Sequence, residues 1–303
     1  MNILAPIVVF TYNRPEHTLR TFNALLENPL ANESDIIIYS DSAKTANHNK
    51  SVDEVRSLLS EITGFRSKKV IHRDKNFGLA ESIIQGVTEV LQESEKVIVL
   101  EDDMVVSPYF LEYMNEALEQ FVEDDRVISV HGYVYPVDFE LPEAFFVKGA
   151  DCWGWATWRR GWEIFEPNGQ FLLDELMRRH LIQEFDYNGA YPYSNMLSAQ
   201  IKGANDSWAI RWHASAFLAD KLTLYPGRSL VHNSGNDGSG THCGNSDRIE
   251  VKLSKTKINL DNIAVESSRI GREAFEIFFK QSQKSLLHQF FGKIKVFVQE
   301  KIR

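Results

Sequence analysis

Three consecutive carboxylates, Glu101, Asp102 and Asp103, directly follow the apolar run from Val97 to Leu100. Burying such charges costs roughly several kcal/mol each unless a cation or hydrogen-bond donors compensate them. A divalent metal would remove that cost, and hard oxygen ligands suit Mg²⁺ or Mn²⁺, which also bind substrate phosphates. The ordinary alternative is a solvated Glu101, a turn capped by Asp102 and a helix that begins at Asp103. The chain contains no P-loop and no GxGxxG motif to indicate a triphosphatase or a dinucleotide enzyme.

Alternating strand and helix signals in the first half of the chain must position these acids. Continuous apolar strands separated by helices predict an α/β fold, with a mainly parallel sheet covered on both faces. The expected strands are residues 7–10, 36–39, 70–72 and 97–100, and the expected helices are about residues 16–26, 52–62 and 79–91.

Polar clusters follow three of these strands: "TYNRP" (Thr11 to Pro15), "SDSAK" (Ser40 to Lys44) and "EDD". In open α/β sheets, ligands bind at the carboxyl ends of the strands. We therefore expect the three clusters to converge on one edge of the sheet. The second half is less regular and richer in aromatic residues, and its glycine-rich stretch from Leu230 to Gly244 predicts a functional loop.

The amino-acid composition argues against several classes of function. The net charge of −9 argues against nonspecific nucleic-acid binding. Cys152 and Cys243 form neither a disulfide framework nor a metal-finger spacing, which favours a reducing, cytoplasmic setting. The N-terminal stretch has the pattern of a first strand rather than of a signal peptide, and no apolar run is long enough to span a bilayer.

Several motifs, in order, give the chain a family resemblance. They are "VVFTYNRPEHTLRTFNAL", "HRDKNFGLAESIIQGV", "VIVLEDDMVVSPYF", "DCWGWATW" and the later "NDSW". With them, the chain from Pro6 to Gly244 resembles the GT-A glycosyltransferases, in particular the family-2-like and N-acetylglucosaminyltransferase I-like branch. The resemblance implies a Rossmann-like GT-A catalytic domain over 1–265, with a donor half at about 1–130 and an acceptor half at about 131–265. Residues 266–303 would form a C-terminal helical tail.

The same resemblance assigns roles to the acidic triplet. In the family, the last aspartate of the DxD motif binds the metal that bridges the donor diphosphate, and the preceding acid approaches the ribose. Asp103 would therefore be the metal ligand and Asp102 the ribose contact, with Glu101 in support. The charges would hold an Mn²⁺ or Mg²⁺ ion that neutralises a leaving nucleoside diphosphate.

Further donor contacts are expected in the loops after the first strands. Thr11, Asn13 and Arg14 lie where the family binds the donor nucleotide, although Pro15 at a helix start is also ordinary capping chemistry. The counterpart of Asp41 commonly meets the base. The remaining expected contacts are Asn76 and Gly78, which open a helix. Plain turns and caps would explain these last three residues equally well.

The catalytic base is expected to be Asp206 in "NDSW", whose position relative to the acidic triplet resembles that of the family's catalytic acid. Trp208 and Trp212 would remove water from its carboxylate and raise its pKa. The alternative is that Asp206 is an N-cap for the following helix. With Asp206 as the base, attack on the anomeric carbon is a single displacement, and the product is inverted.

Aromatic residues near this position are expected to bind the acceptor. Trp153 and Trp155 offer flat faces for a sugar ring, whereas Trp158 is assigned to the core. The acceptor set also includes Trp208 and Arg211. In related enzymes a C-terminal histidine completes the metal site, which makes His232 a further metal candidate and His242 a weaker one.

The tail from Lys284 carries five cations against one glutamate. Its apolar residues recur at three- and four-residue steps and predict an amphipathic helix: Leu287, Phe290, Phe291, Ile294, Phe297, Val298 and Ile302. Such a helix suits packing on the enzyme's own core, a homodimer partner, or the inner face of an anionic membrane.

The leading hypothesis is a metal-dependent, inverting glycosyltransferase that uses a nucleoside diphosphate sugar, with UDP favoured. Its acceptor would be a glycan or lipid-linked glycan in bacterial surface polysaccharide synthesis. Two alternatives stay open at this point: a sugar-phosphate nucleotidyltransferase, which normally carries a glycine- and arginine-rich loop where this chain has "TYNRP", and a non-catalytic carbohydrate-binding module.

Overall fold

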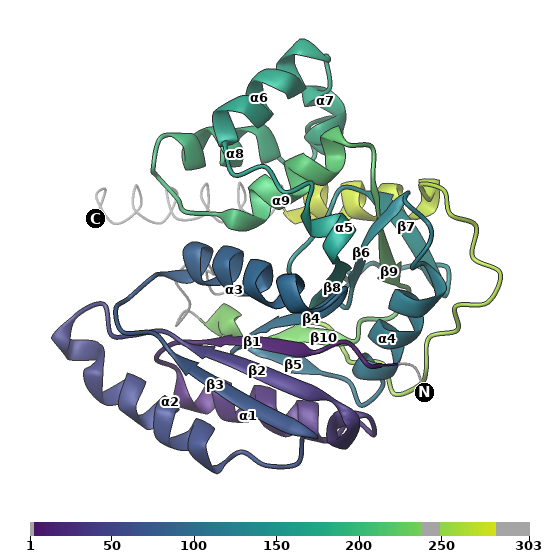
Figure 1. The fold of residues 1–303 in the computed structure, drawn as a ribbon. Coiled ribbons are helices and arrows are strands. Elements are labelled where there is room, and N and C mark those ends of the chain that lie inside the picture. The colour runs from purple at the N-terminus through teal and green to yellow at the C-terminus, as the bar shows by residue number, and fades with distance from the viewer. Residues whose placement is uncertain (1–2, 238–248, 283–303) are drawn as a thin grey trace, which may run out of the picture.

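The computed structural model describes residues 3–237 and 249–282, and within them the chain forms a mixed α/β fold around an eight-stranded sheet (Figure 1). The strand order is β3-β2-β1-β4-β8-β6-β9-β7. The first four strands are parallel, whereas β8 and β7 run antiparallel to their neighbours. Their bounds are β1 Ile7–Thr11, β2 Asp35–Ser40, β3 Ser67–His72, β4 Lys96–Glu101, β6 Val127–His131, β7 Ala144–Lys148, β8 Trp155–Trp158 and β9 Leu222–Pro226.

Alternate residues of the parallel strands face two separate cores. Ile7 and Val9 of β1 pack into one core with the helices α1 (Pro15–Leu26) and α2 (Asn49–Glu61). Val8 and Phe10 point to the opposite face, into the core that contains α3 (Leu79–Glu93). The period of two along a strand explains this division. The expected α/β class, the sheet covered on both faces and the first three helices are confirmed (Figure 1).

The second half of the chain completes the sheet and adds a helical lobe. The strands β5 (Met104–Val106) and β10 (Val231–Asn233) form a separate antiparallel pair. The lobe, drawn above the sheet in Figure 1, has its own apolar core, to which Leu176, Phe185 and Phe217 contribute. The remaining helices are α4 Phe110–Gln120, α5 Arg159–Trp162, α6 Gly169–Arg178, α7 Ile182–Phe185, α8 Tyr193–Ile201 and α9 Trp208–Leu218.

The described part of the tail packs on the protein itself. Residues 269–282 form a helix whose Ala274, Phe275, Phe278 and Phe279 are buried in one apolar cluster with Tyr225 of β9. For this part of the tail, packing on the protein's own core is observed. The predicted amphipathic stretch from Lys284 onward lies outside the described residues, as does His242.

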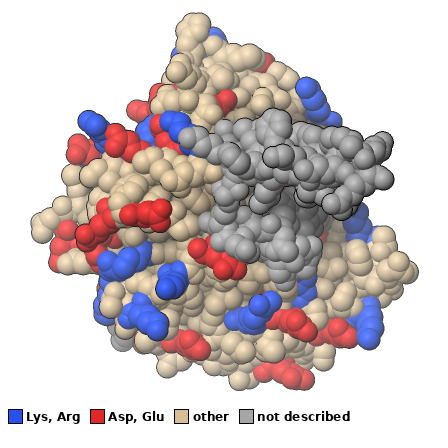
Figure 2. Space-filling model, turned by 180° about the vertical axis from the view of Figure 1, so that it is seen from behind, with Lys and Arg blue, Asp and Glu red and all other residues tan. Residues whose placement is uncertain are grey.

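The described residues give no sign of a membrane span or of a basic stripe on the face in view. None of their helices is both long and apolar enough to cross a bilayer. On the face in Figure 2, lysine and arginine side chains are interspersed with aspartate and glutamate.

Four tryptophans pack together between the sheet and α9. Trp155 of β8 stacks on Trp208 at a ring-centroid distance of 5.5 Å, and Trp162 lies 5.3 Å from Trp212. All four are buried, so they bind the lobe to the sheet by apolar contact.

Replacing Trp155 by alanine is expected to lower the free energy of unfolding by about 3–5 kcal/mol, because it leaves a cavity in this cluster. The matched control is Phe171→Ala on α6, which should change stability by no more than about 0.5 kcal/mol because Phe171 is 52% exposed. Urea denaturation of both variants measures the difference, and equal costs would contradict the packing described.

Candidate active site

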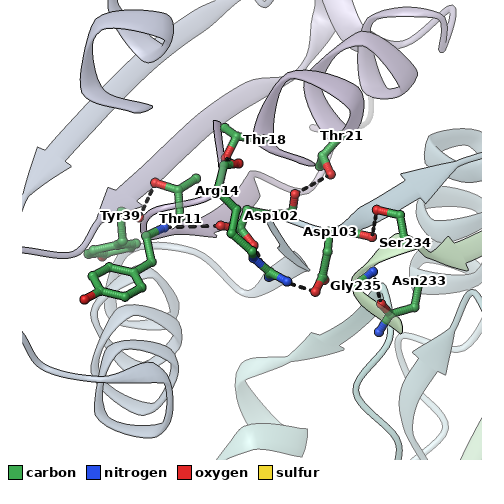
Figure 3. A network of polar contacts seen from close by, with 11 residues as sticks. Thr11, Arg14, Thr18, Thr21, Tyr39, Asp102, Asp103, Asn233, Ser234 and Gly235 are labelled. Carbon is green, nitrogen blue, oxygen red and sulfur yellow. Dashed lines mark hydrogen bonds and ion pairs between the residues drawn. The ribbon is translucent and has the colours of Figure 1, made fainter. Parts of the chain in front are cut away.

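The acidic triplet lies at the carboxyl end of β4, where Asp102 and Asp103 form the turn into β5 (Figure 3). Both side chains are buried, with residue exposures of 3% and 5%. Arg14, from the loop between β1 and α1, reaches across to both of them. Its Nη2 donates to Asp102 Oδ1 and, at 2.8 Å, to Asp103 Oδ2. The polar clusters after β1 and β4 therefore do converge at one edge of the sheet.

Backbone and hydroxyl contacts hold the two aspartates in place from α1 and from the loop after β1. The Tyr12 N–H donates to Asp102 Oδ2 at 3.3 Å, and the Thr21 hydroxyl donates to the Asp102 carbonyl at 2.9 Å. The Thr18 hydroxyl donates to the Arg14 carbonyl at 2.8 Å. Because α1 starts directly after this loop, its first turns clamp both halves of the ion pair (Figure 3).

A second clamp comes from the segment that follows β10, distant in sequence. The Ser234 N–H and hydroxyl both donate to the Asp103 carbonyl, at 2.8 and 3.0 Å. Gly235 lies so close that an added Cβ would clash with Asp103 Oδ2 and lie 3.0 Å from Arg14 Nη1. Ser234 and Gly235 were missed in the sequence interpretation, although they lie at the start of the glycine-rich stretch that it singled out.

The site holds more negative charge than Arg14 alone balances. Burial, followed by the neighbouring Asp103 and Asp102, raises the pKa of Glu101 to about 8. Burial also raises the pKa of Asp102 to about 6, against the opposing effect of Arg14. Burial alone would lower the pKa of Arg14, but Asp102 and Asp103 together raise it above its usual value. A further cation would therefore favour full ionisation of the triplet.

The donor set fits a divalent ion that takes few protein ligands. Asp103 Oδ1 is buried and has no hydrogen-bond partner, so one carboxylate oxygen is available. Mg²⁺ and Mn²⁺ are commonly bound by one or two carboxylates, with waters and phosphate oxygens as the other ligands. No group of three or more His, Cys, Asp or Glu side chains suited to a metal occurs within residues 3–237 and 249–282.

The strand β10 does not place His232 next to Asp103 Oδ1. In the β5–β10 pair it lies opposite Val105, two residues beyond Asp103, and the charges that act on it are those of Glu250 and Arg20. Burial lowers the pKa of His232, and its Nδ1 is buried without a partner. Its assignment as a metal ligand stays a prediction that this geometry does not support.

Asp41 is brought together with Asn76 and Gly78, as expected, but its oxygens are already used. It accepts from Asn76 Nδ2 at 2.9 Å and from the backbone N–H groups of Ser42, Phe77 and Gly78, each at 2.9 Å. Asp41 therefore fixes the loop before α3, in which Gly78 adopts a positive φ of 74°.

The loop after β1 contains the other expected donor contacts. The Thr11 hydroxyl donates to the Tyr39 carbonyl at 3.2 Å and so links β1 to β2, while Asn13 is half-buried beside Arg14. Tyr12, which the sequence interpretation passed over, makes a 2.7 Å hydrogen bond with His48 Nδ1 and accepts from the Lys44 N–H. These contacts order the segment that follows β2.

Two of the expected acceptor residues are buried in the core, which corrects their assignment. Trp155 and Trp208 are 1% and 3% exposed and pack within the tryptophan cluster, so neither presents a ring face to a sugar. Trp158 is buried as predicted, whereas Trp153 is half-buried against Tyr133. Arg211 is also largely buried, and its guanidinium donates to the carbonyls of Ser207 and Pro167.

Asp206 lies just before α9 with its side chain 73% exposed. The expectation that Trp208 and Trp212 would desolvate it is wrong, because both rings point into the core. The N-cap of α9 is Ser207, whose hydroxyl accepts from the Ile210 N–H at 3.2 Å, so Asp206 is not needed for capping. Its carboxylate is open to a ligand, with Arg211 Nη2 at 4.0 Å.

A mixed sheet of this strand order, with an acidic pair at the carboxyl edge of its parallel half, defines a GT-A type α/β protein. The sequence model of glycosyl transferase family 2 matches residues 7–163, just over half of the chain. The protein belongs to glycosyl transferase family 2. This membership favours glycosyl transfer over the nucleotidyltransferase alternative.

Comparison with other proteins gives distant likenesses. No curated protein matches the chain. A Pyrobaculum calidifontis mannosyltransferase, solved with GDP-Man and Mn²⁺, is 14% identical over 45% of this chain and 39% of its own, with a TM-score of 0.31. Residues 1–349 of S. aureus TarS are 12% identical over 77% of this chain and 61% of that one, with a TM-score of 0.40. The chain thus spans less than two thirds of these two solved proteins.

Gly235→Ala is expected to lower the free energy of unfolding by about 1–3 kcal/mol, because the methyl group cannot fit beside Asp103. In an Asp103→Ala background the clash partner is gone, so the same substitution should cost at least about 1 kcal/mol less. A double-mutant cycle by urea denaturation measures this coupling. Strictly additive costs would mean that Gly235 does not pack on Asp103.

Proposed function

We propose that the protein is a metal-dependent, inverting glycosyltransferase that takes a sugar from a nucleoside diphosphate donor, with UDP favoured. The acceptor is a hydroxyl of a glycan or lipid-linked glycan, in the synthesis of a bacterial surface polysaccharide. The N-acetylglucosaminyltransferase I-like branch is part of this proposal, because "EDD" and "NDSW" have the order and context found there.

One observation carries the proposal: a buried aspartate pair bridged by Arg14, with Asp103 Oδ1 left available. Asp103 would hold Mn²⁺ or Mg²⁺, and the bound ion would neutralise charge on the leaving diphosphate. Arg14 lies at the same place, and its buried Nη1 has no partner. It can therefore donate to a phosphate oxygen and supply a second positive charge.

The remaining donor residues shape the nucleotide pocket. Asp102, fixed by Arg14 and the Tyr12 N–H, is the ribose contact in this proposal, and Glu101 supports it. Asp41 acts mainly through the loop of Asn76 and Gly78, which it holds with its carboxylate. Thr11 and Asn13 line the approach beside them. Residues of about 1–130 would thus serve the donor, and residues of about 131–265 the acceptor.

Asp206 is the proposed base that takes the proton from the acceptor hydroxyl. Its exposed carboxylate can reach an incoming hydroxyl without any rearrangement of the core. A base in this role contributes roughly 10²- to 10⁴-fold to the rate. Direct attack by the deprotonated oxygen breaks the bond between the anomeric carbon and the diphosphate in one step, and this inverts the configuration.

A cytoplasmic location, at the inner face of the membrane when a lipid-linked acceptor is bound, completes the proposal. The cationic stretch from Lys284, with its regularly spaced apolar residues, is the feature that supports membrane contact. Homodimerisation through the same stretch is the competing role.

Isothermal titration of UDP, GDP, dTDP and CMP, with and without Mn²⁺, tests the donor site. UDP is expected to bind the wild type when Mn²⁺ is present, and Asp103→Ala should weaken that binding at least about 10-fold, because a metal ligand is lost. The control is Asp53→Ala, an exposed carboxylate on α2, which should leave UDP binding unchanged. If no nucleotide binds under any condition, the transferase proposal loses its support.

Asp206→Asn is expected to reduce kcat by roughly 10²- to 10⁴-fold while UDP affinity and stability stay as in the wild type, since the side chain is exposed. Asp174→Asn, an exposed carboxylate on α6, is the matched control for the lobe. Transfer from an α-linked UDP-sugar, followed by proton NMR, should give the β-linked product. Unchanged kcat in Asp206→Asn would assign the base elsewhere, and a retained α-linkage would exclude single displacement.

A further inference from the structure

Asp151 is a largely buried carboxylate that the roles assigned so far do not use. It lies in the connection between β7 and β8, and its side chain is 22% exposed. Its Oδ1 accepts from the N–H of Cys152 at 2.9 Å. Among the described residues, no lysine or arginine lies within ion-pair distance of it. A largely buried carboxylate without a cationic partner lowers the stability of the fold unless another group binds it.

The nearest ionisable group, His131, does not neutralise Asp151. His131 Nε2 lies 4.0 Å from Asp151 Oδ1, but it accepts the N–H of Trp153 at 3.0 Å. A nitrogen that accepts carries no proton, so the hydrogen of the ring is on Nδ1, which donates to the Tyr133 carbonyl at 2.8 Å. Burial also lowers the pKa of His131, which favours the neutral ring.

Aromatic rings pack near this carboxylate, of which Trp153, Tyr191 and Tyr193 are half-buried and Tyr133 is buried. Trp153 packs edge-on against Tyr133 at 4.8 Å, and Tyr191 lies 4.5 Å from Tyr193. The contacts of His131 link two of these side chains to Asp151, because its ring lies 4.0 Å from Asp151 Oδ1 and hydrogen-bonds to the Trp153 N–H and the Tyr133 carbonyl. Burial and then the charge of Asp151 raise the pKa values of Tyr133, Tyr191 and Tyr193. Rings that are half-buried, with a few polar groups between them, are typical of ligand pockets.

The connection that carries Asp151 leads directly toward the acidic pair. Its end, Gly154, lies so close to β10 that an added Cβ would be 2.7 Å from Val231, three residues before Ser234 at Asp103. The next residue, Trp155, pairs with Val99 of β4, the strand that ends at Glu101. The connection that carries Asp151, in the proposed acceptor half, therefore ends beside β10 and β4, the strands next to the proposed donor-site carboxylates.

We propose that Asp151 binds the acceptor sugar by accepting hydrogen bonds from two neighbouring hydroxyls, while an apolar face of that sugar rests on Trp153 or on the Tyr191–Tyr193 pair. This inference rests on the proposed function, because it names the acceptor subsite of that reaction. A carboxylate has two oxygens to offer to adjacent hydroxyls, and hydrogen bonds to a charged group contribute more than neutral ones. Asp151 thereby takes over the role expected of Trp155 and Trp208.

The test compares the full-length wild type with Asp151→Asn and with Asp220→Asn, an exposed carboxylate that precedes β9 and forms an ion pair with Lys148 at the end of β7. Each protein, fluorescently labelled and mixed with UDP and Mn²⁺, is applied to a glycan array, and UDP binding is measured by titration. The side-chain amide oxygen in Asp151→Asn can still accept from the Cys152 N–H, so the local turn is preserved. We expect Asp151→Asn to bind the wild type's glycans at least about 10-fold more weakly, with UDP affinity and melting temperature unchanged.

Several results would overturn this assignment. They are glycan binding by Asp151→Asn within twofold of the wild type, an equal loss in Asp220→Asn, or a fall in melting temperature that reveals a structural role. Absence of any bound glycan beside normal UDP binding would also overturn it, and would leave the proposed donor chemistry standing. Conversely, glycan binding that depends on Asp151 in a protein that does not bind UDP would keep the sugar site and overturn the proposed transfer reaction.

Turnover with a glycan from the array separates binding from catalysis. Because Asp151 is proposed to bind the acceptor, Asp151→Asn should raise the KM for the acceptor at least about 10-fold and leave kcat nearly unchanged. A collapse of kcat at constant KM would instead make Asp151 the base and contradict the inference.

Discussion

The ion pair between Arg14 and the buried Asp102–Asp103 turn is the interaction on which the site depends. Two aspartates at 3% and 5% exposure lie side by side, and burying both is costly without a cation, which Arg14 supplies from a different strand end. Because β1 and β4 are adjacent and parallel, their carboxyl ends bring the cation and the anions to the same place. The common direction of these strands therefore places the ion pair at their shared end, and the acidic site is formed before a ligand binds.

Segments remote in sequence then fix this turn from three sides. α1 contributes Thr21, the loop after β1 contributes the Tyr12 N–H, and the end of β10 contributes Ser234 and Gly235. The contacts of Ser234 and Thr21 are to the backbone of the two aspartates rather than to their carboxylates. They therefore position the turn without consuming Asp103 Oδ1, the oxygen that the proposed metal would need. Because the site is preorganised, no binding free energy is needed to order the residues that would hold the metal.

The sequence predicted the parts of the fold that local patterns determine. The strands expected at 7–10 and 97–100 are found as Ile7–Thr11 and Lys96–Glu101, because an apolar run that ends in a polar cluster marks a buried strand and its exit. It could not predict that Ser234 lies on Asp103, 131 residues away, since the antiparallel pairing of β10 with β5 leaves no local signature. Nor could it place Trp155 and Trp208, because the same residue type serves a core and a sugar site. Asp41 shows the same limit: its carboxylate looks identical in sequence whether it faces a ligand or three backbone N–H groups.

The distribution of burial between the two halves has a chemical consequence. Asp102 and Asp103 are buried and paired with Arg14 before any ligand arrives, whereas Asp206 is open to water. On the proposed function, the acceptor itself must exclude water from Asp206 as it binds, because the neighbouring tryptophans are committed to the core. A sugar held by Asp151 and the half-buried rings beside it would do this while presenting its hydroxyl. The base would then gain its full strength only when an acceptor is present, which limits loss of the activated donor to water.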